Sequence, residues 1–443
     1  MPRKCVLILL DGLGDRCYEQ LMNQTPLQAA YTPALDHLAE LGASGLYHAS
    51  WAGQALPSEN AHFAMFGYEM EEFPGRGALE ALGARIDLGP RDVAVLAHFV
   101  SVRESDGCLV LEKDRPSASQ DETAALIHAV EEYEEGGVEV RFTQTKKLDG
   151  ILTLRGNVAP FVTDTDSMRE GHPLVEIKPW RGYQQDIAAR NTAKALKAYL
   201  LGSYDKLKNH PVNELRTQTG QPPINGIATQ RAGRLKTVMP FSRKYGLRGL
   251  SIASAFVYWG LAEYIGLYCE KVADTADPGR DFAERLDIAR KALDMYDFIH
   301  VHTKATDEAA HKKDPMAKKS VIESLDRGIG EKIGPLMDDP EVLIVVTADH
   351  CTPSGGPLIH SGETVPLTFF GQGIRRDGVK QFDEISVATG ALGNLRGKEL
   401  IYLILNHLDR AKLKGIMDTP VDQPFWPGNY EAFKIGSDET WKC

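Results

Sequence analysis

Three apolar runs in this sequence each end in a cluster of polar residues, and this pattern is the feature that most constrains the fold. The runs are residues 4–10, 298–302 and 342–347. Each has the length and composition of a strand buried on both faces, and amphipathic stretches lie between such runs. This predicts an α/β fold with a mostly parallel sheet covered by helices on both faces. Ligands bind at the carboxyl edge of such a sheet, so we expect a site where the runs end.

The middle of the chain predicts a compact α+β insert. Helical patterns there span residues 121–133 and 184–208, and strand patterns span residues 137–143 and 150–155. The turn-rich sequence Gly220-Gln221-Pro222-Pro223 marks the end of the insert. The expected domains are a metal-binding core at residues 1–91 and 223–414, an inserted lid at residues 92–222, and a C-terminal extension at residues 415–443.

Composition and charge exclude several classes of function. The formal net charge of -11 argues against a protein that binds the nucleic-acid backbone, because such binding needs a basic face. No apolar run approaches the roughly 20 residues that span a bilayer, and the first run is too short for a signal peptide. The six cysteines show no paired spacing, so we expect reduced thiols rather than disulfides. We therefore expect a cytoplasmic protein with no membrane or nucleic-acid partner.

The polar clusters combine carboxylates with imidazoles, which suits Mn²⁺, Zn²⁺ or Mg²⁺. They contain the following residues: Asp11; Asp307 and His311; Asp349, His350 and His360. Asp307 and His311 are four residues apart, so in a helix they share one face and can bind the same ion. Taken singly, an Asp-Gly turn or a surface Asp/His pair needs no functional explanation. Their occurrence together in one α/β chain indicates a metal site.

A nucleophile is supplied by Ser58 in the segment Leu56-Pro57-Ser58-Glu59-Asn60. A serine hydroxyl is a poor nucleophile until a base or a metal removes its proton, and a second metal can steady a phosphoryl group. Taken alone, a serine after proline and before a helix is more often an N-cap. The metal clusters favour the catalytic interpretation.

These residues give the chain a resemblance to the alkaline phosphatase superfamily, and within it to the archaeal-type, 2,3-bisphosphoglycerate-independent phosphoglycerate mutases. The resemblance covers about residues 4–410. The matching motifs are Leu9-Leu10-Asp11-Gly12, Thr25-Pro26-Leu27-Gln28-Ala29-Ala30, Phe73-Pro74-Gly75-Arg76-Gly77, Asp164-Thr165-Asp166, His210-Pro211-Val212-Asn213, Lys304-Ala305-Thr306-Asp307, Thr347-Ala348-Asp349-His350-Cys351-Thr352 and His360-Ser361-Gly362.

The resemblance implies a pair of divalent ions and a phosphoserine. One ion takes Asp11, Ser58, Asp349 and His350, and the other takes Asp307, His311 and His360. Mn²⁺ is the expected metal, with Mg²⁺, Zn²⁺ and Co²⁺ as alternatives. Ser58 then carries the phosphoryl group between 3-phosphoglycerate and 2-phosphoglycerate, a glycolytic step, while the insert closes over this small phosphorylated substrate. The expected substrate contacts are Arg76, His62, Asp164, Asp166, Arg231 and Lys304. The oligomeric state stays open.

Several positions depart from the family pattern where substrate binds. His62 replaces an expected Asn, and Trp259 replaces an expected Arg. Residues 95–99 and 114–117 also lack arginines that the family carries. Arginine is the natural bidentate partner of carboxylate and phosphate, so these losses bear on the substrate. The alternative is a phosphatase, phosphodiesterase or phosphonate hydrolase that uses the same serine and metals. An inactive binding protein is disfavoured because all seven ligand positions are filled.

Overall fold

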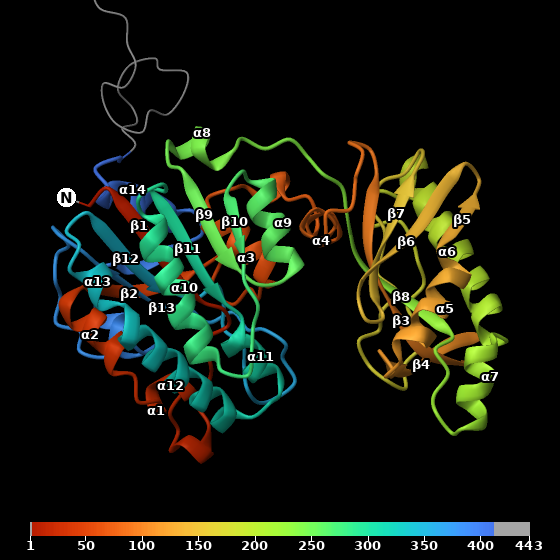
Figure 1. Ribbon diagram of the computed structural model, residues 1–443, viewed down its shortest axis with the longest axis horizontal. Coiled ribbons are helices and arrows are strands. Elements are labelled where there is room, and N and C mark those ends of the chain that lie inside the picture. The colour runs from red at the N-terminus through yellow and green to blue at the C-terminus, as the bar shows by residue number, and fades with distance from the viewer. Residues whose placement is uncertain (1, 412–443) are drawn as a thin grey trace, which may run out of the picture.

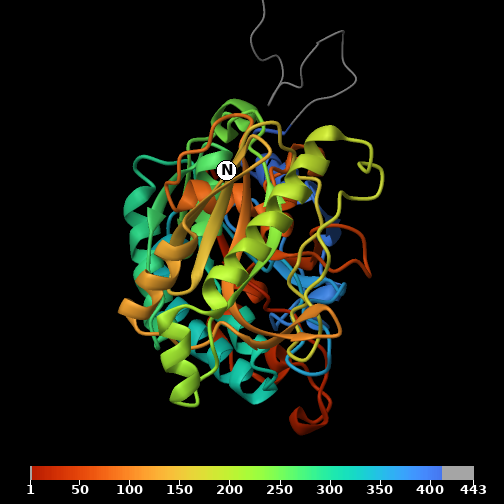
Figure 2. The ribbon, with the colours of Figure 1, turned by 90° about the vertical axis from the view of Figure 1, so that its right-hand side faces the viewer.

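The computed structural model describes residues 2–411, which form two lobes that lie side by side in Figure 1. The first lobe is built on a large sheet at the left of that view, and the second on a smaller sheet at the right. Figure 2 is turned by 90° and places the second lobe toward the viewer. The extension expected at residues 415–443 lies outside the described residues.

The first sheet has eight strands among residues 2–411. Their order across the sheet is β10 (Tyr268–Lys271), β9 (Gly249–Ala253), β11 (Phe298–Thr303), β1 (Lys4–Leu10), β12 (Val342–Thr347), β13 (Val365–Phe370), β2 (Ala43–His48) and β14 (Gly393–Arg396). Neighbouring strands are parallel except for β13, which runs antiparallel to β12 and β2. The expected α/β class with a mostly parallel sheet is therefore confirmed.

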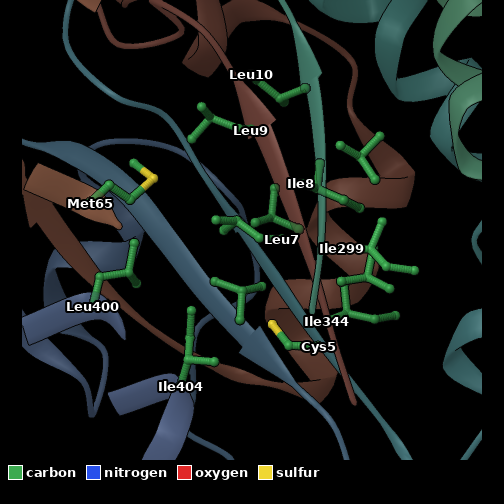
Figure 3. Packing of buried hydrophobic residues seen from close by; sticks show 14 of the residues in the cluster. Cys5, Leu7, Ile8, Leu9, Leu10, Met65, Ile299, Ile344, Leu400 and Ile404 are labelled. Atoms are coloured by element: carbon green, nitrogen blue, oxygen red, sulfur yellow. The ribbon is translucent and has the colours of Figure 1, made fainter. Parts of the chain in front are cut away.

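The central strands β1, β11 and β12 are buried on both faces, which explains their continuous apolar sequences. Successive side chains of a strand point to opposite faces. Figure 3 shows this alternation in β1, where Leu7 and Ile8 lie on opposite sides of the strand. Leu7 lies on the side of Met65 and Leu400, and Ile8 lies on the side of Ile299. Both faces of the sheet thus belong to one hydrophobic core.

The helices are numbered in chain order and are divided between the two lobes. In the first lobe they are α1 (Pro26–Ala29), α2 (Pro33–Leu41), α3 (Ser58–Met65), α4 (Arg76–Gly83), α8 (Phe241–Tyr245), α9 (Phe256–Tyr264), α10 (Pro278–Ala292), α11 (Ala305–His311), α12 (Pro315–Lys332), α13 (Gly334–Met337) and α14 (Glu399–His407). In the second lobe they are α5 (Gln120–Val130), α6 (Ile187–Lys208) and α7 (Pro211–Gln218). Short 3-10 helices are η1 (Glu19–Leu21), η2 (Met70–Glu72) and η3 (Ser386–Thr389).

The second sheet is antiparallel and has its own apolar core. Its strands are β4 (Cys108–Asp114), β3 (Val93–Ser105), β7 (Asp149–Arg155), β6 (Val138–Lys146), β5 (Glu132–Glu135) and β8 (Gly226–Gly233). Strand β8 pairs with β3, although it lies beyond residue 222, where we expected the insert to end. The second sheet therefore extends to Gly233. The sequence did not indicate this pairing, because β3 lies more than a hundred residues before β8 in the chain.

No helix among residues 2–411 is both long enough and apolar enough to cross a bilayer.

Candidate active site

The predicted carboxylates converge at the carboxyl edge of the first sheet. Asp11 directly follows β1, Asp349 lies two residues after β12, and Asp307 lies in α11, which begins just after β11. Strands β1, β11 and β12 are adjacent and parallel, so their carboxyl ends meet at one edge. Each of the three carboxylates is at most 1% exposed. The fold therefore brings Asp11 next to two carboxylates that lie about 300 positions or more further along the chain, as the pattern of strand ends predicted.

Ser58 is the first residue of α3, and its hydroxyl points into this cluster. Its Oγ lies 2.9 Å from His350 Nε2 and 3.5 Å from Asp11 Oδ1. The N-cap position of α3 is occupied by Pro57, and no side chain caps the helix. The alternative of an N-cap serine is therefore wrong, and the Ser58 hydroxyl is left available to the cluster.

The seven predicted metal ligands all lie in this cluster, in two overlapping groups. In one group, His350 Nε2 lies 3.1 Å from Asp349 Oδ2 and 3.8 Å from Asp11 Oδ1. In the other group, Asp307 Oδ1 lies 3.2 Å from His311 Nε2 and 3.6 Å from His360 Nε2. The rings of His350 and His360 stack with centroids 3.9 Å apart, so the two groups are contiguous.

A carboxylate oxygen of the cluster is left without a hydrogen bond among the described residues. Asp349 Oδ2 is buried and makes no hydrogen bond within residues 2–411, although two imidazole nitrogens lie within 3.5 Å of it. Buried carboxylate and imidazole donors that converge in this way fit a hard or borderline divalent ion. The residues present therefore fit the metals that the sequence led us to expect.

Neighbouring charges keep the three carboxylates ionised. Burial by itself would raise their pKa values. For Asp349, the adjacent His350 outweighs burial and holds the pKa well below its usual range. For Asp11, Lys304 and a hydrogen bond from His302 bring the pKa below the usual value despite burial and the repulsion from Asp349. The pKa of Asp307 is likewise lowered, in spite of its burial, by hydrogen bonds with His311 and His360.

Thr352, which was not predicted as a site residue, links the two groups. Its Oγ1 lies 2.8 Å from Asp307 Oδ1 and 3.1 Å from His350 Nδ1. An ionised carboxylate can only accept, so the threonine hydroxyl donates to Asp307 and accepts from His350 Nδ1. This assigns the proton of His350 to Nδ1 and leaves Nε2 as the ligand atom, a common arrangement around metals. Its place in the motif Asp349-His350-Cys351-Thr352 was the available sequence signal.

Gly12 allows the loop after β1 to approach the loop after β12. Its φ is +65°, a region that favours glycine, and its N–H donates to Asp349 Oδ1 at 2.9 Å. A Cβ atom at this position would lie 2.6 Å from Thr352 Oγ1 and 2.8 Å from the Cβ of Asp307. The Asp-Gly pair is thus required by the packing of the cluster and is more than a turn signal.

Lys304 and His62, both expected to contact substrate, occupy different environments. Lys304 Nζ lies 2.8 Å from Asp307 Oδ2 and 3.8 Å from Asp11 Oδ2, and its side chain is 28% exposed. It therefore contacts the cluster and is also partly open to solvent. His62 is 0% exposed and packs against the rings of His302 and Tyr258, so the structure does not place it where substrate would touch it.

Three of the four remaining predicted substrate residues, Arg76, Asp164 and Arg231, lie between the lobes. A cavity of about 660 Å³ there is lined by Pro57, Glu59, Arg76, Asp164 and Arg231, among others. Both arginines are paired with Glu59: Arg231 Nη1 lies 2.7 Å and Arg76 Nη1 3.5 Å from its carboxylate oxygens. Asp164 accepts from the backbone N–H of Arg231 at 2.6 Å. Glu59 was not predicted as a site residue.

Asp166 is held within the second lobe. Its carboxylate accepts hydrogen bonds from the side chain of Gln230 and from the backbone N–H of Met168. His98 Nε2 lies 3.7 Å from the same carboxylate and 3.0 Å from Asp114 Oδ1. Asp166 therefore supports the wall of β8 that carries Arg231, rather than the metal cluster.

The fold and this cluster define a metal-dependent enzyme with a serine at its centre. Residues 3–407 match the model of the metalloenzyme superfamily. The 2,3-bisphosphoglycerate-independent phosphoglycerate mutase 2 of Methanocaldococcus jannaschii is 39% identical over 423 residues, covering 93% of this chain and 95% of that protein. The corresponding mutase of Methanopyrus kandleri is 37% identical over 423 residues, covering 94% of this chain and 99% of that protein.

A solved structure agrees with these relatives. The cofactor-independent phosphoglycerate mutase from Thermoplasma acidophilum superposes with a TM-score of 0.62 at 28% identity, covering 92% of this chain and 100% of that chain. The chain belongs to the 2,3-bisphosphoglycerate-independent phosphoglycerate mutase family of the metalloenzyme superfamily. The resemblance drawn from the sequence motifs is confirmed.

Proposed function

We propose that this chain interconverts 3-phosphoglycerate and 2-phosphoglycerate by passing the phosphoryl group to and from Ser58. The observation that carries the proposal is the position of the Ser58 hydroxyl, 2.9 Å from His350 Nε2 and at the junction of the two ligand groups. Membership of the mutase family supports the same conclusion.

The seven ligands would hold two divalent ions, with Mn²⁺ expected first and Mg²⁺, Zn²⁺ or Co²⁺ as alternatives. Asp11, Ser58, Asp349 and His350 would hold one ion, and Asp307, His311 and His360 the other. Ions bound there would polarise the phosphoryl oxygens and favour the deprotonated serine at neutral pH. Thr352 orients both groups through Asp307 and His350.

The other residues of the site bind and orient the substrate. Arg76 and Arg231 line the cavity beside Ser58 and can take the carboxylate or the phosphate of a glycerate ester through paired hydrogen bonds. Lys304 reaches from the edge of the cluster toward the same anion. A mutase must retain its glycerate while the phosphoryl group rests on serine, so closure of the second lobe over the first would exclude water.

The experiment is phosphorus NMR of 3-phosphoglycerate incubated with the enzyme and Mn²⁺. We expect the resonance of 2-phosphoglycerate to grow to a constant ratio with that of 3-phosphoglycerate. Accumulation of inorganic phosphate instead would overturn the mutase assignment and identify the chain as a hydrolase. The metal is assigned by repeating the measurement with Mn²⁺, Mg²⁺, Zn²⁺ and Co²⁺ added singly to protein freed of metal by a chelator.

A further inference from the structure

A group of buried imidazoles lies directly beneath Asp11, outside the two ligand groups described above. His62 belongs to α3, and His300 and His302 alternate along one face of β11, with exposures of 0%, 1% and 0%. One oxygen of Asp11 and one nitrogen each of His62 and His302 all lie within 4.8 Å of one another. Such convergence of three donor atoms in a fully buried place calls for a physical reason.

The two oxygens of Asp11 face different surroundings. Oδ1 faces the serine side, 3.5 Å from Ser58 Oγ. Oδ2 faces the imidazole side, 3.0 Å from His302 Nε2 and 2.6 Å from the hydroxyl of Tyr258. A carboxylate placed in this way can bridge two cations, giving one oxygen to each. Asp11 is therefore suited to belong to two adjacent metal sites.

His62 presents an unused lone pair to this group. Its Nδ1 lies 2.8 Å from the backbone carbonyl oxygen of Ser58, which can only accept, so Nδ1 carries the proton. Its Nε2 is then an acceptor, and it has no hydrogen-bond partner anywhere in residues 2–411. Leaving a buried acceptor unsatisfied costs about 1–3 kcal/mol. A histidine whose other N–H donates to a backbone carbonyl is the usual form of a metal ligand.

The donor set also indicates which ion would be bound. Two imidazoles, one carboxylate and an open fourth position form a ligand set that Zn²⁺ takes in proteins. Tyr258 packs against this group, with its ring centroid 4.0 Å from that of His302 and its hydroxyl donating to Asp11 Oδ2. For His302 to ligate through Nε2, its proton must move to Nδ1, which is buried and makes no hydrogen bond to any described residue.

We propose that Asp11, His62 and His302 form a third cation site, suited to Zn²⁺, beneath the two-metal cluster. Asp11 would then give Oδ2 to this site and Oδ1 to the ligand group of Ser58, and an ion held there would fix the carboxylate that the two sites share. The departure of His62 from the Asn that the sequence comparison led us to expect then has a role as a ligand, in place of the substrate contact first expected of it.

The test counts and locates Zn²⁺ ions in the full-length chain. Protein freed of metal by a chelator is reloaded with Zn²⁺, excess ion is removed, and the ions per chain are counted by mass spectrometry. We expect three ions in the wild type and two in both His302→Gln and His62→Asn. His360→Ala is the matched control: it should lose an ion from the other group and keep the one beneath Asp11.

Anomalous diffraction at the zinc edge from wild-type crystals locates the ions and does not depend on how well any variant folds. A peak between Asp11, His62 and His302 is the expected result. Two or fewer ions in the wild type, or no peak at that position, would overturn the third site. Mutase turnover is measured separately by phosphorus NMR. Two ions with mutase turnover would contradict only the third site. Three ions without turnover would contradict only the proposed function.

Discussion

The ligand cluster at the edge of the first sheet and the arginines between the lobes differ in how their charged groups are paired. In the cluster, Asp11 and Asp349 lie close together, and each is stabilised by neighbouring cationic or polar groups. Between the lobes, Arg76 and Arg231 already share one counter-charge, the carboxylate of Glu59. The cluster is ready to accept cations as it stands, whereas the arginines must exchange a partner before they can bind an anion.

The difference also concerns movement. The ligands of the cluster come from loops of one lobe, and Gly12 and Thr352 fix these loops to one another. The arginines come from two lobes, because Arg76 begins α4 and Arg231 belongs to β8 of the second sheet. Glu59 therefore ties the lobes together in this structure. We infer that substrate binding rearranges the arginines and leaves the cluster almost unchanged.

The largest effect is expected from Ser58→Ala. If Ser58 is the covalent carrier, its loss removes the acceptor of the phosphoryl group, and turnover should fall by roughly a thousandfold or more. The fold should persist, because Ser58 does not cap α3 and the loss of its buried hydrogen bond to His350 should cost only about 1–3 kcal/mol. Phosphorus NMR at saturating Mn²⁺ measures turnover, and calorimetry measures the melting temperature.

The matched control is Ser50→Ala, in the loop before α3, where the hydroxyl bonds to Gln54. This variant should keep wild-type turnover. If Ser58→Ala retained even a tenth of the wild-type rate, the serine could not be the carrier. The mechanism would then have to be rebuilt around attack by water.

His360→Ala tests whether the cluster is prearranged for cations. His360 Nε2 lies 3.6 Å from Asp307 Oδ1 and its side chain is 15% exposed, so its loss should empty one site without disturbing the core. Affinity for one ion should fall by about a hundredfold or more, and turnover with it. Titration calorimetry with Mn²⁺ measures the affinity. His37→Ala, on the surface of α2, is the control, and an unchanged stoichiometry in His360→Ala would remove His360 from the ligand set.

Arg231→Ala tests the arginine side of the comparison. If Arg231 binds the anionic substrate as proposed, its loss removes a bidentate partner, and KM for 3-phosphoglycerate should rise by roughly ten- to a hundredfold. Metal content should stay at the wild-type value, because Arg231 does not touch the cluster in the described structure. Arg103→Ala, which removes an exposed arginine elsewhere on the second sheet, is the control. A loss of bound metal with unchanged KM would contradict the division of roles between the two regions.

Much of the first lobe and of the cluster could be predicted from the sequence. The strands expected at residues 4–10 and 342–347 are observed with those bounds, because strands buried on both faces have continuous apolar sequences. The ligands followed from the same pattern, since the carboxyl ends of parallel strands meet at one edge. Element boundaries in the insert were close as well: the helix expected at residues 184–208 is observed as Ile187–Lys208.

The remaining features depend on contacts that sequence spacing does not encode. Strand β8 was missed as part of the second sheet because its partner β3 is remote in the sequence. Glu59 was not recognised because its role comes from arginines on two other elements. His62 was assigned to substrate because it replaces an Asn of the family pattern, but its side chain is fully buried, on the inner side of α3.

A carboxylate far from both regions provides a reference for the effect of burial alone. Asp326 of α12 is 1% exposed and accepts the backbone N–H groups of Leu35 and Ala34 at the start of α2. Burial raises its pKa to about 6, and the two hydrogen bonds only partly offset this. In the cluster, burial acts in the same direction, but imidazoles and Lys304 reverse it. Asp326 therefore shows what the cluster carboxylates would do without their neighbours.

The smallest expected effect is on the pH dependence of stability in Asp326→Asn. A folded pKa of about 6, above the unfolded value of about 4, means that the folded state binds more protons between these values. This contribution is fully present below pH 4 and is lost as pH rises through 6, by about 2–3 kcal/mol at most. Asparagine does not titrate, so relative to the wild type the variant should become more stable by that amount between pH 4 and pH 7. Urea unfolding across this range measures the difference, and parallel curves for the two proteins would show that burial does not raise the pKa of Asp326.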